Sequence, residues 1–368
     1  MPEEQNTIKK VAVLDDYAGI ARKHFDNIPS IQVSYYDKTL IAAKEDDLHA
    51  LIQRLQPYEI VSSMRERTAF PPALLSSLPN LKLLLTTGMR NNSISLPSAT
   101  EHKILVTGTK GNRLPDSHYE DKTYEPPPPV EGPSSVIQHS WALLLSLCSK
   151  ITEHHNLLQN THGGDGEEWQ SGTIISLAGK TLGLVGLGKL GTQFGRIAVQ
   201  SFGMRVVAWS QNLTQEKADE AAQSVGLPKG TFEVVGSKKE LCERADVVSL
   251  HMVLSERSRG IIGKEELGWM KKSAVLLNTS RGGLIDQEAL IGCLKEGGIA
   301  GFASDVFWEE PLGRESVWRK VGEWSKSQVL LSPHMAYVNE GTMNRWYEEQ
   351  VENLGLWLRG EEVRNRLN

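Results

Sequence analysis

The sequence is poor in cysteine, in long apolar runs and in stretches of like charge, and each absence excludes a class of protein. Its three cysteines, Cys148, Cys242 and Cys293, are far apart and odd in number, so they match neither a disulfide framework nor metal-ligand spacing. No apolar run is long enough for a membrane span. The first residues are polar and acidic, unlike a signal or transit peptide. We expect a cytoplasmic protein with no metal site.

Neither sign of charge dominates. The chain has 40 Lys and Arg against 45 Asp and Glu, which gives a formal net charge of −5. The basic residues are scattered and form no run that would make a positive patch. Such a composition provides no electrostatic basis for binding nucleic acid or an anionic membrane, so we expect neither partner.

The length of 368 residues exceeds the usual size of one domain and predicts two. Residues 9–106 alternate short apolar runs with helical patterns, which is typical of an α/β domain with a parallel sheet. Residues 110–134 break this rhythm and contain four consecutive prolines, at 126–129, that fit neither a helix nor an inner strand. We interpret this stretch as a flexible surface insertion. A proline-rich partner site is the alternative.

A second α/β region contains the most informative motif. A short apolar run at 182–185 predicts a buried strand, and Gly-x-Gly-x-x-Gly follows it directly, opening a helical pattern. In a dinucleotide-binding turn, Gly186 permits the tight turn, Gly188 lets the backbone approach the pyrophosphate, and Gly191 lets helix and strand pack closely. The pyrophosphate then binds at the helix N-terminus. A glycine-rich structural turn is the alternative.

Three polar motifs follow predicted strands of the second region. They are Asn-Thr-Ser-Arg-Gly at 278–282, Asp-Val-Phe-x-x-Glu-Pro at 305–311 and Ser-Pro-His at 332–334. Ligands of a doubly wound sheet bind beyond the carboxyl ends of its strands, so we expect these motifs to meet at one site.

The residue types in these motifs suit hydride transfer between a nicotinamide and a 2-oxo acid. Arg281 would pair with the substrate carboxylate and help to polarise the carbonyl. His334 would exchange the hydroxyl proton, and Glu310 would stabilise the protonated imidazole. Asp305 would accept a hydrogen bond from the nicotinamide carboxamide.

Taken together, the glycine motif and the three strand-end motifs resemble the D-isomer-specific 2-hydroxyacid dehydrogenases, which include glyoxylate/hydroxypyruvate reductases and phosphoglycerate dehydrogenases. The motifs occur in family order and spacing, and the resemblance covers nearly the whole chain except 110–134. It implies that Arg281, Glu310 and His334 are catalytic, with Glu310 rather than Glu309 as the family's glutamate.

The resemblance also implies two Rossmann-like doubly wound α/β domains with a cleft between them. The substrate domain would comprise residues 1–135 and 337–368, the dinucleotide-binding domain residues 136–336, and the chain would form a homodimer through the latter. Loops of the first domain would contact substrate through Arg65, Gly88 and Met89, together with Arg281. The residues expected to bind the cofactor are Gly186, Gly188, Lys189, Leu190, Gly191, Ser210, Gln211, His251, Asn278, Thr279, Ser280, Asp305 and Ala336.

Several positions depart from the family pattern. Where an acid would bind the adenosine ribose, the chain has Ser-Gln-Asn at 210–212, with neither acid nor arginine. This lack of a carboxylate slightly favours NADP over NAD. Ile-Gln-His at 137–139 replaces the family's Ala-Glu-His, and His-Met-Val at 251–253 replaces His-x-Pro. Met335 and Ala336 replace the glycine-bearing turn after the histidine.

The sequence thus predicts an NAD(P)-dependent oxidoreductase that reduces a small 2-oxo acid to a D-2-hydroxy acid, with glyoxylate or hydroxypyruvate as the first candidates. The alternative from another class is a dinucleotide-sensing scaffold, similar to the C-terminal binding proteins, with little or no turnover. Turnover separates the two, because a scaffold would bind cofactor without reducing any acid.

Overall fold

The computed structural model describes residues 8–111, 134–160, 170 and 172–368. They form two compact units, the first comprising residues 8–111 with Val338–Asn368 and the second residues 134–337. Residues 112–133, which make up most of the predicted insertion, lie outside the described residues. Within the described ranges no helix combines the length and apolar character that crossing a bilayer requires.

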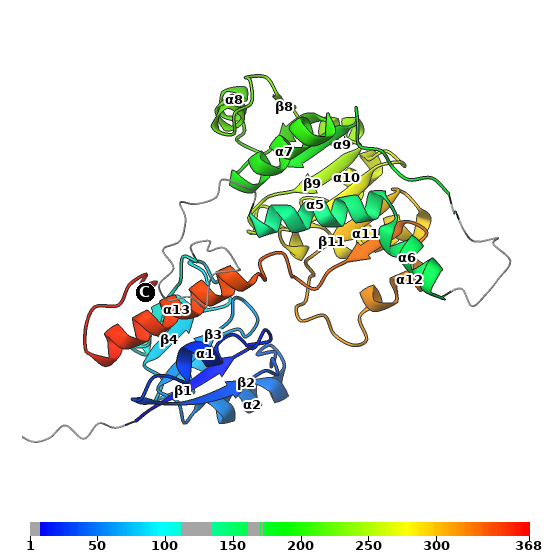
Figure 1. The fold of residues 1–368 in the computed structure, drawn as a ribbon. Helices are drawn as coiled ribbons and strands as arrows, with labels where there is room; N and C mark the ends of the chain where they lie inside the picture. The colour runs from blue at the N-terminus through cyan, green and yellow to red at the C-terminus, as the bar shows by residue number, and fades with distance from the viewer. Residues whose placement is uncertain (1–7, 112–133, 161–169, 171) are drawn as a thin grey trace, which may run out of the picture. The chain divides into compact units, whose positions relative to one another are not determined.

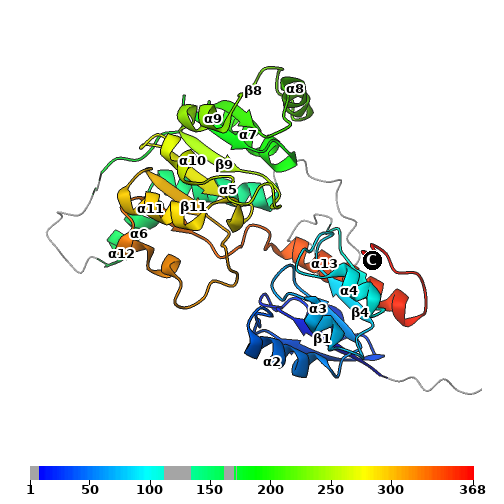
Figure 2. The same ribbon diagram turned by 180° about the vertical axis from the view of Figure 1, so that it is seen from behind.

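The first unit is built on a parallel five-stranded sheet in the order β2-β1-β3-β4-β5. Its strands are β1 (Lys9–Leu14), β2 (Ile31–Tyr36), β3 (Ile60–Ser63), β4 (Leu83–Thr86) and β5 (Leu105–Thr107), and its helices are α1 (Arg22–Phe25), α2 (Glu45–Leu55), α3 (Pro72–Ser76), α4 (Leu96–Glu101) and α13 (Glu340–Leu358). Helices α1 and α13 face the viewer in Figure 1, and α2, α3 and α4 do so in Figure 2, so helices cover both faces of the sheet. Both faces of β3 and β4 are therefore buried.

Buried polar side chains hold α13 in the first unit. Gln350 accepts a 2.5 Å hydrogen bond from Ser62 at the end of β3, and the Tyr347 hydroxyl donates to Asp16 after β1. Glu349 accepts from the backbone amides of Lys110 and Gly111. The helix is therefore part of the first unit although it follows the second unit in the chain.

The second unit is built on a parallel seven-stranded sheet in the order β12-β11-β10-β9-β6-β7-β8. Its strands are β6 (Thr181–Val185), β7 (Arg205–Trp209), β8 (Phe232–Val234), β9 (Val247–Leu250), β10 (Val275–Asn278), β11 (Gly301–Ser304) and β12 (Gln328–Leu331). Its helices are α5 (Ser135–Cys148), α6 (Ile151–Asn160), α7 (Lys189–Phe202), α8 (Gln215–Ser224), α9 (Lys238–Arg244), α10 (Lys264–Trp269), α11 (Gln287–Glu296) and α12 (Val321–Trp324), with short 3₁₀ helices η2 (Gly282–Leu284) and η3 (Val317–Lys320).

Two apolar cores lie on opposite faces of this sheet. Side chains alternate along a strand, so Val206 and Ala208 of β7 belong to one core and Val207 belongs to the other. Helices α5 and α7 cover the first core, whereas α9, α10 and α11 cover the second. The prediction of two doubly wound parallel-sheet domains is confirmed.

Strand β6 is the first strand of the second sheet along the chain, and the order in which strands are added reverses beside it. It proceeds outward to β7 and β8 on one side, then crosses back to β9 and continues to β12 on the other. Chain segments that leave the carboxyl ends of β6 and β9 therefore diverge and leave a crevice where ligands of doubly wound folds bind.

Candidate active site

The glycine turn after β6 has the three features that a bound pyrophosphate requires. Gly186 has a φ of +98°, and a Cβ there would lie 2.7 Å from the His251 carbonyl oxygen. At Gly188 a Cβ would meet nothing within 4 Å, so the space above the turn is open. At Gly191 a Cβ would lie 2.5 Å from the Gly186 oxygen. Since the first amides of α7 have no intrahelical acceptor, the turn fits a dinucleotide phosphate.

An open pocket of about 520 Å³ extends from this turn along the ends of β7 and β9. Ser210 and Gln211 line it, as predicted for the cofactor site, while Lys189 and Leu190 lie exposed at the start of α7. Two cationic residues that the sequence analysis missed, Lys217 and Arg257, line it too. The Lys217 ammonium donates to the Asn212 carbonyl at 3.2 Å, which holds it beside the 210–212 turn. No acidic residue is among the described residues that line this pocket.

His251 lies behind the glycine turn. Its Nε2 is 2.9 Å from the Ser249 hydroxyl, and its ring packs 5.3 Å from the Phe194 ring, centroid to centroid. Burial lowers the pKa of His251 to about 4, so the ring is neutral near neutral pH. The neighbouring Met252 and Val253 form the pocket wall at this point.

The Arg281 turn after β10 is fixed by its own polar side chains. Asn278 accepts from the Ser280 amide at 3.1 Å and donates to the Arg281 carbonyl at 2.9 Å, while the Ser280 hydroxyl donates to the carbonyl of Leu250, the last residue of β9. A Cβ at Gly282 would overlap the backbone of Phe307, so only glycine lets this turn touch the 305–310 segment. The sequence thereby brings Arg281 next to the segment that carries Glu310.

Glu310 and His334 meet directly. Glu310 Oε2 lies 2.5 Å from His334 Nδ1, and Glu310 Oε1 accepts from the Phe307 amide at 2.8 Å. Both side chains are half-buried, while the neighbouring Glu309 is exposed. The structure therefore brings together two of the three predicted catalytic residues.

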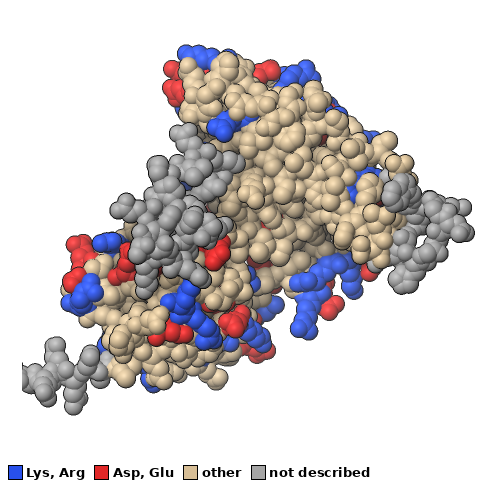
Figure 3. Space-filling model, in the orientation of Figure 1, with Lys and Arg blue, Asp and Glu red and all other residues tan. Residues whose placement is uncertain are grey.

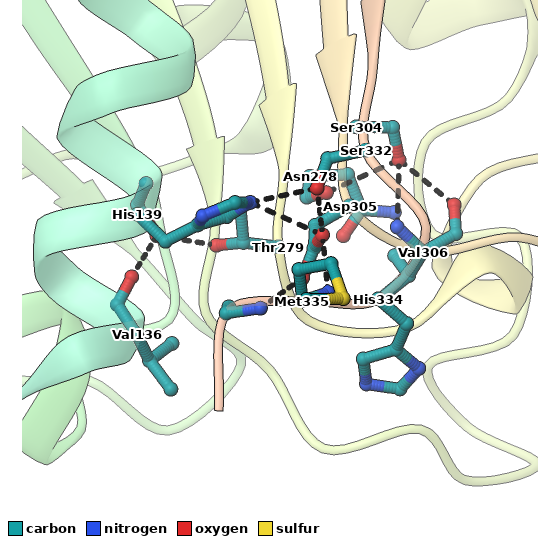
Figure 4. Close-up of polar contacts among 12 residues, drawn as sticks. Val136, His139, Asn278, Thr279, Ser304, Asp305, Val306, Ser332, His334 and Met335 are labelled. Carbon is teal, nitrogen blue, oxygen red and sulfur yellow. Dashed lines mark hydrogen bonds and ion pairs between the residues drawn. The ribbon is translucent and has the colours of Figure 1, made fainter. Parts of the chain in front are cut away.

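Asp305 anchors the turn that carries His334. Its Oδ1 accepts from the Ser332 hydroxyl at 2.6 Å and the Met335 amide at 2.8 Å, and its Oδ2 accepts from the Ala336 amide at 2.9 Å. His139 of α5 reaches the same carboxylate, with Nε2 3.2 Å from Oδ1 (Figure 4). Burial raises the pKa of Asp305, but hydrogen bonds from His139, Ser332 and the two amides outweigh burial and leave that pKa below its usual value.

This anchoring explains the unusual backbone of His334. Its φ is +58°, a left-handed conformation that costs a non-glycine residue roughly 1 kcal/mol. Hydrogen bonds to Asp305 from both sides of the residue stabilise it. Figure 4 shows the His334 ring pointing away from the Asp305 carboxylate. The Asp305 carboxylate is fully buried, and its four donors come from the chain itself. Asp305 therefore holds the His334 turn in place, a role that the sequence analysis did not predict.

The predicted substrate residues of the first unit also lie together. The Arg65 amide donates to Thr87 at 2.8 Å, and the Arg65 carbonyl accepts from Asn91 at 2.7 Å. The Arg65 guanidinium lies over Gly88, where a Cβ would overlap it. Met89 is exposed beside them, with 39% of its surface accessible. In the described part of the chain no three His, Cys, Asp or Glu side chains are placed to hold a metal ion together.

A sheet with a dinucleotide turn at its switch point, and with an acid–imidazole pair beside an arginine turn, is typical of nicotinamide-dependent oxidoreductases. Comparison with known proteins narrows this class. Residues 141–336 match the model of the D-isomer specific 2-hydroxyacid dehydrogenase NAD binding domain. The chain therefore belongs to the D-isomer specific 2-hydroxyacid dehydrogenase family and is an enzyme that uses a nicotinamide cofactor.

Individual relatives support the same family assignment. A glyoxylate reductase of Thermococcus litoralis is 30% identical over 304 residues, covering 80% of this chain and 79% of that protein. A D-3-phosphoglycerate dehydrogenase of Methanocaldococcus jannaschii is 30% identical over 320 residues, covering 86% of this chain and 53% of that longer protein. Among solved structures, a phosphoglycerate oxidoreductase from Vibrio cholerae superposes with a TM-score of 0.77 at 27% identity, covering 96% of this chain and all of that one.

Proposed function

We propose that this enzyme reduces a small 2-oxo acid to the D-2-hydroxy acid, with glyoxylate or hydroxypyruvate as the first candidates. The observation that carries the proposal is the 2.5 Å contact between Glu310 and His334, on the segment that touches the Arg281 turn. His334 would serve as the acid and Arg281 as the cation that binds the substrate carboxylate. Both follow strands of the sheet at the ends where the dinucleotide pocket opens.

Each residue has a distinct task in this proposal. Arg281 binds the substrate carboxylate with its planar fork, which orients the carbonyl. His334 donates the proton that the carbonyl oxygen takes up, from the ring nitrogen opposite Glu310. Glu310 fixes the ring through Nδ1 and offsets the charge of the protonated imidazole. A bound nicotinamide supplies the hydride, and the glycine turn with Ser210 and Gln211 holds that cofactor.

We further propose that NADPH is preferred over NADH. The pocket beside Ser210 and Gln211 is lined by the cations Lys217 and Arg257 and by no described acid. An acid would repel a 2′-phosphate, whereas two cations attract one. Because both cations are solvent-exposed, their contribution is moderate and depends on salt.

The enzyme is proposed to dimerise through the second unit. Helix α5 contains no Lys, Arg, Asp or Glu, and Figure 3 shows few charged side chains on the face above it. Ile151 and Leu158 of α6 and the following Ile174 each expose more than half of their surface. An uncharged face bordered by exposed apolar residues supports a subunit contact there. Sedimentation at micromolar concentration tests this: the wild type should be dimeric, and Leu158→Glu should be monomeric.

The proposed activity is tested by the oxidation of NADPH and NADH, at equal concentration, with glyoxylate, hydroxypyruvate and a panel of bulkier 2-oxo acids. Saturable oxidation with a small acid, faster with NADPH, is the expected result. Tight cofactor binding without oxidation across the panel would contradict the proposal and favour a dinucleotide-sensing scaffold.

A further inference from the structure

We propose that His139 is a positioning residue for His334, acting through Asp305 and Ser332. Its catalytic consequence rests on the proposed function, whereas its structural consequence does not. His139 lies on α5, whereas Asp305 follows β11 and Ser332 follows β12, so one imidazole ties a helix to the ends of two neighbouring strands.

The position of His139 is fixed by the helix that carries it. Ser134 caps the start of α5, and His139 lies in the second turn. The next residue, Ser140, pairs its hydroxyl with Thr279 Oγ1 at 2.7 Å, just beyond β10. Because this contact secures α5 against the sheet edge beside His139, the imidazole approaches the Asp305 carboxylate from a fixed direction.

The geometry also fixes which hydrogen His139 carries. Its Nε2 lies 2.9 Å from Ser332 Oγ and 3.2 Å from Asp305 Oδ1. The Ser332 hydroxyl already donates to Oδ1 at 2.6 Å, so the Nε2 hydrogen must be the donor toward the pair. Figure 4 shows the ring of His139 directed at these two side chains. His139 thus completes a set of donors around a carboxylate that has no access to water.

That carboxylate sets the path of the chain on both sides of His334. Asp305 binds Ser332, two residues before the catalytic histidine, and the amides of Met335 and Ala336 after it. A buried carboxylate that loses a donor must draw in water or move, because an unmet acceptor in the interior is costly. Either response loosens the turn that holds His334 in its left-handed conformation and aligned with Glu310.

Plain packing does not account for this arrangement. About a quarter of the His139 side chain (27%) is accessible, whereas its helix neighbours Ile137 and Trp141 fill the apolar core. The polar contacts of the His139 ring go to Ser332 and Asp305. A donor at this position therefore matters more than the volume of the side chain.

The test compares His139→Phe, which keeps a ring but removes the donor, with His139→Gln, which keeps an N–H. Amide hydrogen exchange is measured on peptides spanning residues 332–337, alongside kcat, the KM for the 2-oxo acid and the cofactor Kd. For His139→Phe we expect exchange at least tenfold faster, kcat about tenfold lower and a cofactor Kd within twofold of wild type. His139→Gln should restore both exchange and kcat to within about threefold.

Two further variants complete the design. His49→Phe, the same substitution at an exposed position on α2, should change neither exchange nor kcat. Ser332→Ala removes the other side-chain donor to Asp305. Because both substitutions act on the same carboxylate, the kcat loss in the double variant should be smaller than the product of the losses in the two single variants. Ser332→Ala also keeps the proposal testable if His139→Phe folds poorly, because it removes a donor to Asp305 without altering α5.

Unchanged exchange in His139→Phe would overturn the proposal, and so would faster exchange with an unchanged kcat. A glutamine variant as impaired as the phenylalanine variant would assign the effect to packing of α5 and contradict the role of the donor. If the wild type reduces no 2-oxo acid, the proposed function fails, while the exchange measurement still decides whether His139 holds the turn.

Discussion

The carboxylate of Glu310 lies 2.5 Å from Nδ1 of His334, across 24 residues of sequence. The same segment also carries Asp305, which accepts from the Ser332 hydroxyl before His334 and from the backbone amides of Met335 and Ala336 after it. Two carboxylates five residues apart therefore hold one histidine, one through its ring and the other through the residues that flank it. In the proposed mechanism this double attachment pre-organises the proton donor, which is what general acid catalysis requires.

Arg281→Ala should reduce kcat/KM for the 2-oxo acid on the order of a hundredfold, equivalent to about 3 kcal/mol, because a charge-assisted pair to the substrate carboxylate is lost. The cofactor Kd, from quenching of intrinsic fluorescence, should stay within twofold. Arg281→Lys keeps the charge without the planar fork and should recover only part of the activity. Loss of cofactor binding in Arg281→Ala would contradict the assigned role.

Substitution by alanine should affect cofactor binding at one glycine of the dinucleotide turn and stability at another. Gly188 has φ −89° and ψ −168°, which any residue adopts, and its Cβ would meet nothing within 4 Å. Gly188→Ala should therefore leave the melting temperature nearly unchanged while raising the cofactor Kd at least tenfold. In Gly191→Ala the new methyl lies 2.5 Å from the Gly186 oxygen and should cost roughly 1–3 kcal/mol of stability. Equal cofactor affinity in Gly188→Ala would place the pyrophosphate elsewhere.

Lys217→Ala and Arg257→Ala should each weaken NADPH binding by about tenfold or less and leave NADH binding unchanged, since only NADPH carries the 2′-phosphate. The preference for NADPH over NADH should also decrease as the salt concentration increases. Titrations with adenosine 2′,5′-bisphosphate and ADP measure this without turnover. Lys239→Ala, an exposed lysine on α9, is the control. Similar losses for both cofactors would assign the two cations to the pyrophosphate instead.

His251 should make the native state sensitive to mild acid. Its pKa in the fold, about 4, lies below the ordinary value of 6.5, so between these pH values the unfolded chain binds a proton that the native protein does not. Stability should therefore fall as the pH falls from 6.5 to 4, by up to about 3 kcal/mol. In His251→Asn this part of the decline should vanish. Denaturant unfolding at pH 7 and pH 4.5 gives the comparison, and parallel losses in both proteins would exclude His251 as the cause.

The sequence predicted those parts of the site that are formed by residues close together in the chain. The glycine turn and the Arg281 turn are each made by a few consecutive residues, and Glu310 and His334 follow strands that a parallel sheet brings to one edge. Their motifs therefore carry the chemistry even before the fold is known.

The rest depends on strand order and side-chain direction. Lys217 follows the predicted 210–212 turn closely in the chain, whereas Arg257 follows β9 and reaches the same pocket because β6 pairs with both β7 and β9. Asp305 was predicted to face the cofactor, yet its burial and its four donors show that it also holds the His334 turn. No sequence pattern indicates that His139, on a helix, reaches that carboxylate.

The central claim is tested most directly by His334→Ala, measured for the steady-state reduction of the preferred 2-oxo acid beside the cofactor Kd and the melting temperature. The account predicts a kcat at least a hundredfold lower, with unchanged folding and cofactor affinity. A variant that folds, binds cofactor and turns over at the wild-type rate would exclude His334 as the proton donor and contradict the proposed mechanism.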